Sequence, residues 1–229
     1  MNVAVVVDNL PRLLQGALLT VELVALALLV GMILALPTAL MRVSEHRWLR
    51  WPALVYVFFF RGTPLLVQIF LVYYGLGQFE AVRASVLWPL LREPYWCAII
   101  AFALNTGAYT AEILRGAIEA VPAGEVQAAH AFGMSKALCY RRIVLPQAFR
   151  IAMPAYGNEI ILMLKGSALA STITLLDLTG MARTVIARTY MPVEIFLAAG
   201  VLYLLMTFAF TQAYRRLERR LNRHLLHRA

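Results

Sequence analysis

Several polar side chains lie within long apolar stretches of the sequence, where such groups are costly and are functional candidates by default. Glu159 is the clearest case, with Asn158 beside it and Lys165 six residues later, about 9 Å along a helix. A carboxylate that faces a water-filled cavity attracts an ammonium or guanidinium group. Alternatively, Glu159 pairs with Lys165 or with a neighbouring helix, or caps broken backbone, and the sequence leaves these alternatives open.

Uncharged polar residues extend this set of candidate binding residues. Asn105 and Thr106 can hydrogen-bond the polar groups of a small ligand, and they can equally join two helices. Gln68 is a weaker candidate, and Ser167 is a further polar residue in an apolar region. The sequence therefore predicts a small polar site built from several apolar segments.

Other charged groups are expected to serve structure. Glu112 lies near the end of its apolar segment and is expected to be an interfacial charge, and Glu22 a structural or interfacial one. Arg61-Gly62-Thr63-Pro64 interrupts an apolar run. We expect it to shape a chain break, because glycine relieves backbone strain and proline suits the first turn of a helix.

Enzyme chemistry and ATP binding find no support in the sequence. No nucleophile–base pair and no metal-ligand spacing occur, and Cys97 and Cys139 are expected to be free thiols. The two lysines, Lys136 and Lys165, do not follow glycine as a phosphate-binding P-loop requires. We therefore expect no cofactor and no metal in this chain.

The composition is that of a membrane protein. The 229 residues are 62% hydrophobic and only 14% charged, with a mean hydropathy of +0.73, whereas soluble domains are about half apolar and a quarter charged. We expect a single all-helical membrane domain over residues 1–229 with about five spans. They are residues 16–41, a broken region over 51–79 with a short interfacial segment and then a span over about 64–77, residues 95–118, a span from near Pro146, and residues 193–214.

Basic residues indicate the orientation of these spans. Fourteen of the 21 lysines and arginines fall on one side, in two loops and the tail, and five on the other. This asymmetry predicts an N-terminus outside the cytoplasmic membrane and a C-terminus in the cytoplasm. The net charge of +9 is attributed to these basic ends and not to nucleic-acid binding. The fourteen are Arg42, Arg47, Arg50, Arg115, Lys136, Arg141, Arg142, Arg150, Arg215, Arg216, Arg219, Arg220, Arg223 and Arg228.

The segment from about residue 120 to 146 is polar, small and basic, unlike the rest of the chain. Pro122 suits the first turn of a short helix that Gly133 ends, since glycine readily adopts a left-handed conformation. Ser135 can cap a second short helix, which Pro146 is expected to end. We expect an exposed docking face with small side chains, Ala128 and Ala129, beside an aromatic anchor, Phe132; the alternative is an ordinary amphipathic loop.

The spacing in this segment resembles the loop found in the permeases of ABC importers. Its pattern is EAA, three residues, glycine, nine residues, isoleucine, one residue and LP. Here it is matched by Gln127, Ala128, Ala129, Gly133, Ile143, Leu145 and Pro146, with glutamine where the family usually has glutamate. Three further stretches resemble the permeases that transport polar amino acids, namely histidine, arginine, lysine, ornithine or glutamine, and resemble the arginine type most. They are "FRGTPLLVQIFLVYYGLGQF", "LNTGAYTAEILRGAI" and "YGNEIILMLKGSALASTITLLDLTG".

The resemblance implies a type I ABC importer permease fold and a set of partners. Two cytoplasmic P-loop ATPases would bind ATP and magnesium, a second permease would complete a homo- or heterodimer in the lipid membrane, and a periplasmic or extracellular binding protein would deliver the amino acid. ATP binding and hydrolysis would drive alternating access, with no covalent chemistry in this chain. A glutamine importer, an ion-gradient-driven transporter and a structural membrane subunit are the alternatives.

Overall fold

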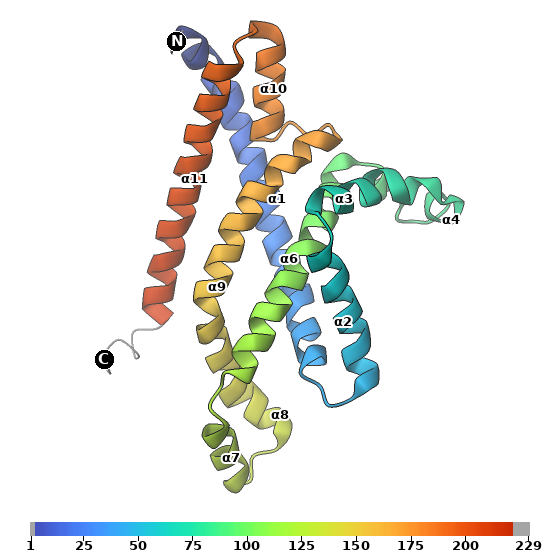
Figure 1. Ribbon diagram of the computed structural model, residues 1–229, viewed down its shortest axis with the longest axis vertical. Helices are drawn as coiled ribbons and strands as arrows, with labels where there is room; N and C mark the ends of the chain where they lie inside the picture. Colours follow the sequence, from blue (N-terminus) through green and yellow to red (C-terminus); the bar gives the residue numbers. More distant parts are fainter. Residues whose placement is uncertain (1–2, 222–229) are drawn as a thin grey trace.

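The computed structural model describes residues 3–221, and within that range it is built of helices (Figure 1). Four long helices run along the molecule, two short helices lie at one end, and shorter helices project to one side. The α-helices are α1 Val3–Arg42, α2 Arg47–Gly62, α3 Leu65–Phe70, α4 Glu80–Arg83, α5 Trp88–Leu91, α6 Pro94–Glu119, α7 Ala123–Ala131, α8 Lys136–Cys139, α9 Leu145–Gly166, α10 Leu178–Thr189 and α11 Pro192–Leu221.

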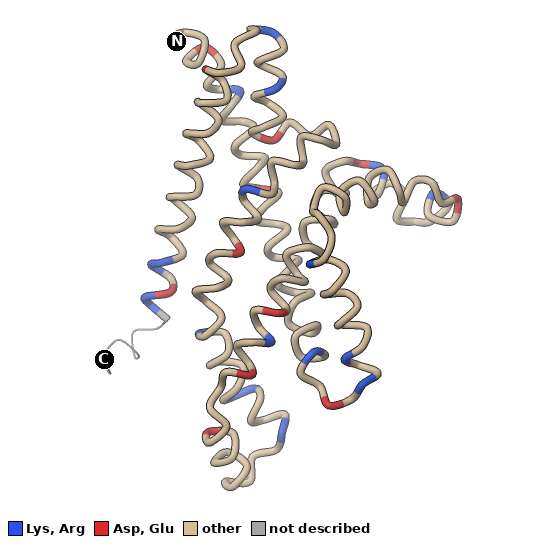
Figure 2. Tube along the Cα trace, in the orientation of Figure 1, with Lys and Arg blue, Asp and Glu red and all other residues tan. Residues whose placement is uncertain are grey.

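Three of these helices are long and apolar enough to cross a membrane, and the number reaches five if each of two bent helix pairs is one span. This agrees with the count expected from the sequence. Residues 95–118 and 193–214 fall within α6 and α11, and α1 begins well before the predicted start at residue 16. Lysines and arginines gather in the loop after α1, around α7 and α8, and at the end of α11 (Figure 2). Arg223 and Arg228 lie outside the described residues.

The region 51–79 differs from its prediction. Thr63 is extended, with φ −115° and ψ 146°, because the residue before a proline avoids helical backbone. The predicted break is therefore present, but the segment before it is a 16-residue helix that packs on α1 and α6, and not a short interfacial one. Residues 65–78 continue at 109° to α2.

The Pro146 prediction was wrong. The helix that starts at Lys136 continues as one rod to Ile173, through a π-helical turn over Tyr140–Val144 and into α9. A proline lacks the N–H for a normal helical bond, and a widened π turn accommodates such a gap without ending the helix. Pro146 lies in the first turn of α9, beside this widened turn.

A close glycine contact fixes α6 against α1. A Cβ atom on Gly31 would lie 2.5 Å from Thr106 Cγ2, and one on Gly107 would lie 3.2 Å from the Gly31 carbonyl oxygen. Small residues at a membrane helix interface let the backbones approach in this way. The contact sets the rotation of α6 and so the direction in which Asn105 and Thr106 face.

Candidate functional site

A cavity of about 300 Å³ with a partly polar lining lies where the α2–α3 break meets α6 and α9. Its polar lining includes Asn105 and Tyr109 from α6, Glu159 from α9 and Thr63 from the break. Leu162 and Met163 line its apolar part. The structure thus brings two of the predicted binding residues, Asn105 and Glu159, into one cavity.

Glu159 is buried with one strong partner. Its Oε1 accepts a hydrogen bond of 2.9 Å from the Thr106 hydroxyl. Within residues 3–221 its second oxygen has no hydrogen-bond donor and is not among the fully enclosed polar atoms. That oxygen is therefore available to the cavity. The predicted alternative of a pair with Lys165 is wrong, because no ion pair joins the two in the described part of the chain.

Gln68 and Asn105 hold the chain break together. Gln68 Nε2 donates to the Phe60 carbonyl at 2.8 Å and to the Thr63 carbonyl at 3.0 Å, and its Oε1 accepts from Asn105 Nδ2 at 2.9 Å. These bonds satisfy carbonyls that the end of α2 leaves without helical partners. The Gln68 amide is thus fully used in hydrogen bonds at the chain break. Asn105 hydrogen-bonds Gln68 there and also lines the cavity.

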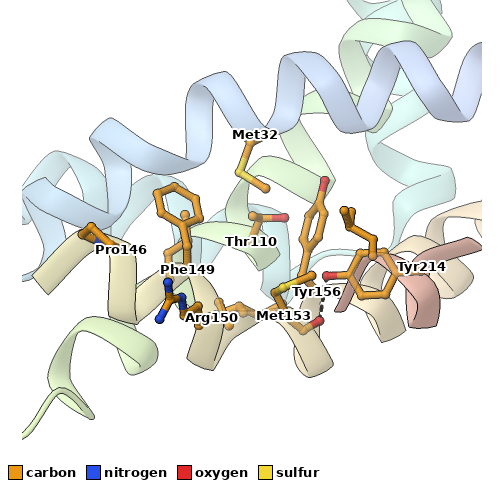
Figure 3. Close-up of a pocket in the computed structure, with 12 residues that line it drawn as sticks. Met32, Thr110, Pro146, Phe149, Arg150, Met153, Tyr156 and Tyr214 are labelled. Atoms are coloured by element: carbon orange, nitrogen blue, oxygen red, sulfur yellow. Dashed lines mark hydrogen bonds between the residues drawn. The ribbon is translucent and has the colours of Figure 1, made fainter. Parts of the chain in front are cut away.

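Two predicted residues lie elsewhere. Asn158 is exposed and faces a different pocket, with Tyr214 and Glu218, because consecutive residues of a helix point about 100° apart. The buried Ser167 hydroxyl donates to the Leu164 carbonyl. Neither lines the cavity with Glu159. A further, apolar cavity opens beside α11 (Figure 3), and among the predicted residues it includes only Pro146.

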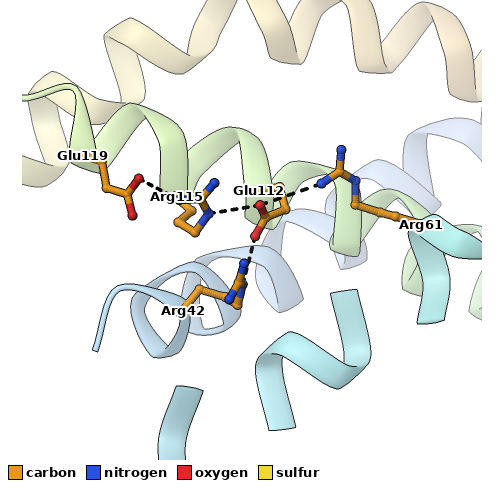
Figure 4. A network of polar contacts seen from close by, with 5 residues as sticks. All are labelled: Arg42, Arg61, Glu112, Arg115 and Glu119. Atoms are coloured by element: carbon orange, nitrogen blue, oxygen red, sulfur yellow. Dashed lines mark hydrogen bonds and ion pairs between the residues drawn. The ribbon is translucent and has the colours of Figure 1, made fainter. Parts of the chain in front are cut away.

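A cluster of charges around Glu112 was missed by sequence reasoning (Figure 4). Arg42 and Arg115 bind its two carboxylate oxygens at 2.9 and 3.0 Å, and Arg61 lies 3.7 Å away. The i,i+3 spacing to Arg115 was visible in the sequence, but Arg42 and Arg61 come from other helices. Glu112 is therefore an anchor for α1, α2 and α6 and not the simple interfacial charge that we expected.

Arg61 and Tyr109 stand between two cavities. Tyr109 lines the cavity of Glu159 and also a second cavity of about 540 Å³ that contains Arg42, Arg61 and Glu112. The Arg61 guanidinium lies 5.2 Å from the centre of the Tyr109 ring, a cation–π contact. Tyr109 is thus shared by the two cavities, and Arg61 contacts its ring from the larger one.

The predicted docking segment forms α7, a tight turn and α8. Gly133 has φ +79° and the Ser135 hydroxyl caps α8, both as expected. Gln127 and Ala128 are exposed and Phe132 is 88% exposed, but the expectation that Ala129 is exposed was wrong. Ala129 lies on the face of α7 that is turned toward the bundle. It packs there in an apolar cluster that Ile143 and Leu145 also contact.

Lys136 ties this segment to the loop between α1 and α2. Its Nζ donates to Glu45 Oε1 at 3.0 Å. The hydrogen bond from Lys136 lowers the pKa of Glu45, and the same bond raises the pKa of Lys136. Both side chains are exposed, so the pair orients α8 and adds little stability.

Comparison with known proteins decides the family. Residues 27–223 match the family described as "Binding-protein-dependent transport system inner membrane component". The chain belongs to this family. The permease is 53% identical to the octopine transport system permease protein OccM of Rhizobium meliloti over 90% of this chain and 84% of that one. It is 47% identical to the nopaline permease protein NocM of Agrobacterium fabrum, over 98% and 94% of the two chains.

Two further relatives complete the comparison. The permease is 43% identical to the histidine/lysine/arginine/ornithine permease protein HisM of Escherichia coli K12, over 92% of this chain and 89% of that one. It superposes on the crystal structure of an amino acid ABC transporter with histidines with a TM-score of 0.85 and 35% identity, over 96% and 99% of the chains. The predicted membrane permease fold, and a transporter subunit instead of an enzyme, are confirmed.

Proposed function

We propose that this permease forms one half of the pathway of an ATP-driven importer for amino acids with a cationic side chain, and that Glu159 binds the cation. The observation that carries the proposal is the environment of Glu159. It lines a cavity that mixes polar and apolar groups, its hydrogen-bond donor Thr106 is uncharged, and one carboxylate oxygen stays open. A buried carboxylate without a fixed cationic partner gains most from a ligand that brings the positive charge.

The names of the relatives support a cationic substrate. Octopine and nopaline are derivatives of arginine that keep its guanidinium group, and HisM is named for histidine, lysine, arginine and ornithine. A carboxylate binds a guanidinium with two parallel hydrogen bonds. Since Thr106 occupies part of the coordination of Glu159, a guanidinium would use mainly the open oxygen. Asn105 and the Thr63 hydroxyl are the neighbouring groups for the α-carboxylate and α-amino groups.

The partners and the orientation belong to the same proposal. The α7–α8 segment docks a cytoplasmic P-loop ATPase, of which two copies bind ATP and magnesium, and a binding protein delivers the amino acid from the periplasm. A second permease, identical or not, closes the other side of the pathway. The N-terminus then lies outside the inner membrane and the C-terminus in the cytoplasm, which places the arginines near the end of α11 on the cytoplasmic side.

The two cavities give alternating access a route through this chain. The cavity of about 300 Å³ (the upper cavity) contains Glu159, the cavity of about 540 Å³ (the lower cavity) contains Arg61 and Glu112, and Tyr109 lines both. The cation would leave Glu159 when Arg61 and Tyr109 separate, because Arg61 otherwise repels it from the lower cavity. ATP binding and hydrolysis would move the docking segment and, through the α8–α9 rod, Glu159.

Uptake into liposomes tests the proposal. The assembled complex is reconstituted with ATP inside and binding protein with labelled arginine outside, and ATP is omitted as the control. We expect ATP-dependent uptake that excess lysine, histidine, ornithine or octopine blocks and glutamine does not. A block by glutamine alone would retain the importer and overturn the cationic substrate. Uptake without ATP would favour an ion-gradient-driven transporter.

A further inference from the structure

An apolar cavity of about 310 Å³ opens between α1, α6, α9 and α11, nearer the start of α9 than the Glu159 site (Figure 3). Met32, Ile113, Met153 and Leu217 contribute apolar side chains from these four helices. Tyr214 marks one boundary, since its hydroxyl donates to the Met153 carbonyl at 2.8 Å. None of the residues assigned to cation binding lines this cavity.

One polar atom in this apolar wall lacks a partner. The Thr110 hydroxyl oxygen is fully enclosed, and it alone among the buried side-chain oxygens and nitrogens of the described residues has no hydrogen bond. Threonines in the long helices usually bond the carbonyl four residues earlier, as Thr20, Thr38, Thr184, Thr189 and Thr211 do here. Thr110 forgoes that bond and its side chain lines the cavity, so a rotation about its Cα–Cβ bond would present the enclosed hydroxyl to an acceptor oxygen of a ligand there.

The cavity is bounded by the helix that is most exposed to the membrane. Only 11% of the apolar window of α11 is buried within the molecule, so its remaining surface faces lipid or another membrane chain. At the end near α7, Arg150 lines the cavity, and Arg220 lies one helical turn beyond Leu217 on the same face of α11. Both arginines are exposed, and neither forms an ion pair within residues 3–221.

We propose that this cavity binds an anionic phospholipid of the cytoplasmic leaflet. One acyl chain fills the space lined by Met32, Ile113 and Met153, the Thr110 hydroxyl donates to an ester carbonyl oxygen, and Arg150 and Arg220 bind the phosphate. Basic residues beside a pocket between helices on the cytoplasmic side are typical of such headgroup sites. The inference rests on the orientation given under the proposed function, since it requires the α7 end to face the cytoplasm.

The proposed lipid would join α9 to α11 at the end where the docking segment lies. Here the two helices otherwise meet through Tyr214 and the Met153 carbonyl. A lipid between them would satisfy the enclosed Thr110 hydroxyl and neutralise part of the basic rim. It would therefore hold α11 in place while α9 moves with the docking segment.

Retention of lipid by the purified complex tests the proposal without any transport assay. The complex is reconstituted in vesicles of equal phosphatidylglycerol and phosphatidylethanolamine, extracted in detergent and weighed by native mass spectrometry. We expect one retained phosphatidylglycerol per permease chain of this type. Ala152→Phe, which fills the cavity, should abolish retention, whereas Ala155→Phe on the exposed face of α9 should not.

Charge variants of Arg150 and Arg220, the basic rim of the cavity, test the proposal even if Ala152→Phe fails to assemble. Arg150→Gln and Arg220→Gln should each lower the preference for phosphatidylglycerol roughly fivefold, and Arg215→Gln, which lines the separate pocket of Asn158, should not. Equal retention of both lipids, or unchanged retention in the rim variants, would overturn the proposal. So would oxidative disulfide cross-linking of a Leu217→Cys variant to a cysteine introduced into the second permease, because protein would then cover the cavity. A failed transport assay with normal lipid retention would count against the proposed function alone.

Discussion

Thr106 and Glu159, 53 residues apart in the sequence, share a hydrogen bond of 2.9 Å between α6 and α9. The bond occupies one carboxylate oxygen and leaves the other at the cavity that Asn105 also lines. A fixed donor of this kind orients a carboxylate before any ligand arrives. The ligand therefore meets a charge whose direction is already set, which lowers the entropy lost on binding.

Neutralising Glu159 should discriminate between substrates by charge. In Glu159→Gln we expect the apparent affinity for arginine to fall about tenfold or more, because a charge-assisted hydrogen bond is lost, with a smaller change for neutral amino acids. Thr106→Val is the matched control, since it removes the orienting donor and keeps the charge. Concentration-dependent uptake of arginine and glutamine is the measurement. Equal losses for both amino acids in Glu159→Gln would assign that residue a structural role.

Two glycines of the docking segment should respond oppositely to alanine. A Cβ atom on either Gly124 or Gly133 meets nothing within 4 Å, but only Gly133 has a positive φ, of 79°. Gly133→Ala should therefore destabilise the turn by about 1 kcal/mol, whereas Gly124→Ala, in the first turn of α7, should be neutral or slightly stabilising.

Thermal unfolding and ATP hydrolysis stimulated by loaded binding protein measure the glycine variants. Gly133→Val, with a β-branched side chain, should strain the turn further and uncouple hydrolysis from uptake. Normal transport by a normally assembled Gly133→Val complex would show that the turn does not transmit movement.

Phe132 should matter for docking and not for the fold. It is 88% exposed, so the permease itself gains almost nothing from it, whereas a buried aromatic anchor at an interface commonly contributes 2 kcal/mol or more. Phe132→Ala should weaken ATPase binding roughly thirtyfold and leave the unfolding temperature of the isolated permease unchanged. Tyr190→Ala, at an equally exposed aromatic (86%) at the far end of α10, is the control. Full ATPase retention in Phe132→Ala would remove the anchor role.

The arginines around Glu112 should differ in their effect on stability. Arg42 binds Glu112 at 2.9 Å with little exposure, while Arg61 lies 3.7 Å away and its side chain is 44% exposed. Arg42→Gln should cost about 2 kcal/mol, and Arg61→Gln less than about 1 kcal/mol. Thermal unfolding of the purified complex compares them.

Transport separates the second role proposed for Arg61. Since Arg61 stacks on Tyr109 between the two cavities, Arg61→Gln should change the rate of uptake more than stability. If Arg61→Gln instead unfolds the complex as readily as Arg42→Gln, then Arg61 is an anchor like the others.

Local signals in the sequence predicted local structure well. Gly133, Ser135 and the break before Pro64 lie where backbone preferences place them, because those preferences act within a few residues. The assignment of a substrate site to the polar residues of the apolar segments stays a prediction. Glu159 and Asn105 share a cavity, and Thr106 meets Glu159, as residues at costly positions in apolar helices often do.

The failures have different physical causes. The arginines of α1 and α2 that reach Glu112 are not spaced on its helix, so no periodicity reveals them. Asn158 and Ser167 were grouped with Glu159 by polarity, although helical rotation and a backbone carbonyl direct them elsewhere. The end of the helix at Pro146 was misjudged because a π turn absorbs the missing N–H.

That π turn determines how far movement at the docking segment reaches. Because the helix is unbroken from Lys136 to Ile173, Lys136 and Glu159 are about 35 Å apart along one axis. A tilt of only about 10° at the docking end would therefore displace the carboxylate by roughly 6 Å over that length, about one helical turn. If the helix ended at Pro146, a loop would absorb the same tilt. If the ATPase docks here as proposed, the widened turn would convert a small angular change at the docking segment into a displacement comparable to the size of the charged group of the proposed substrate.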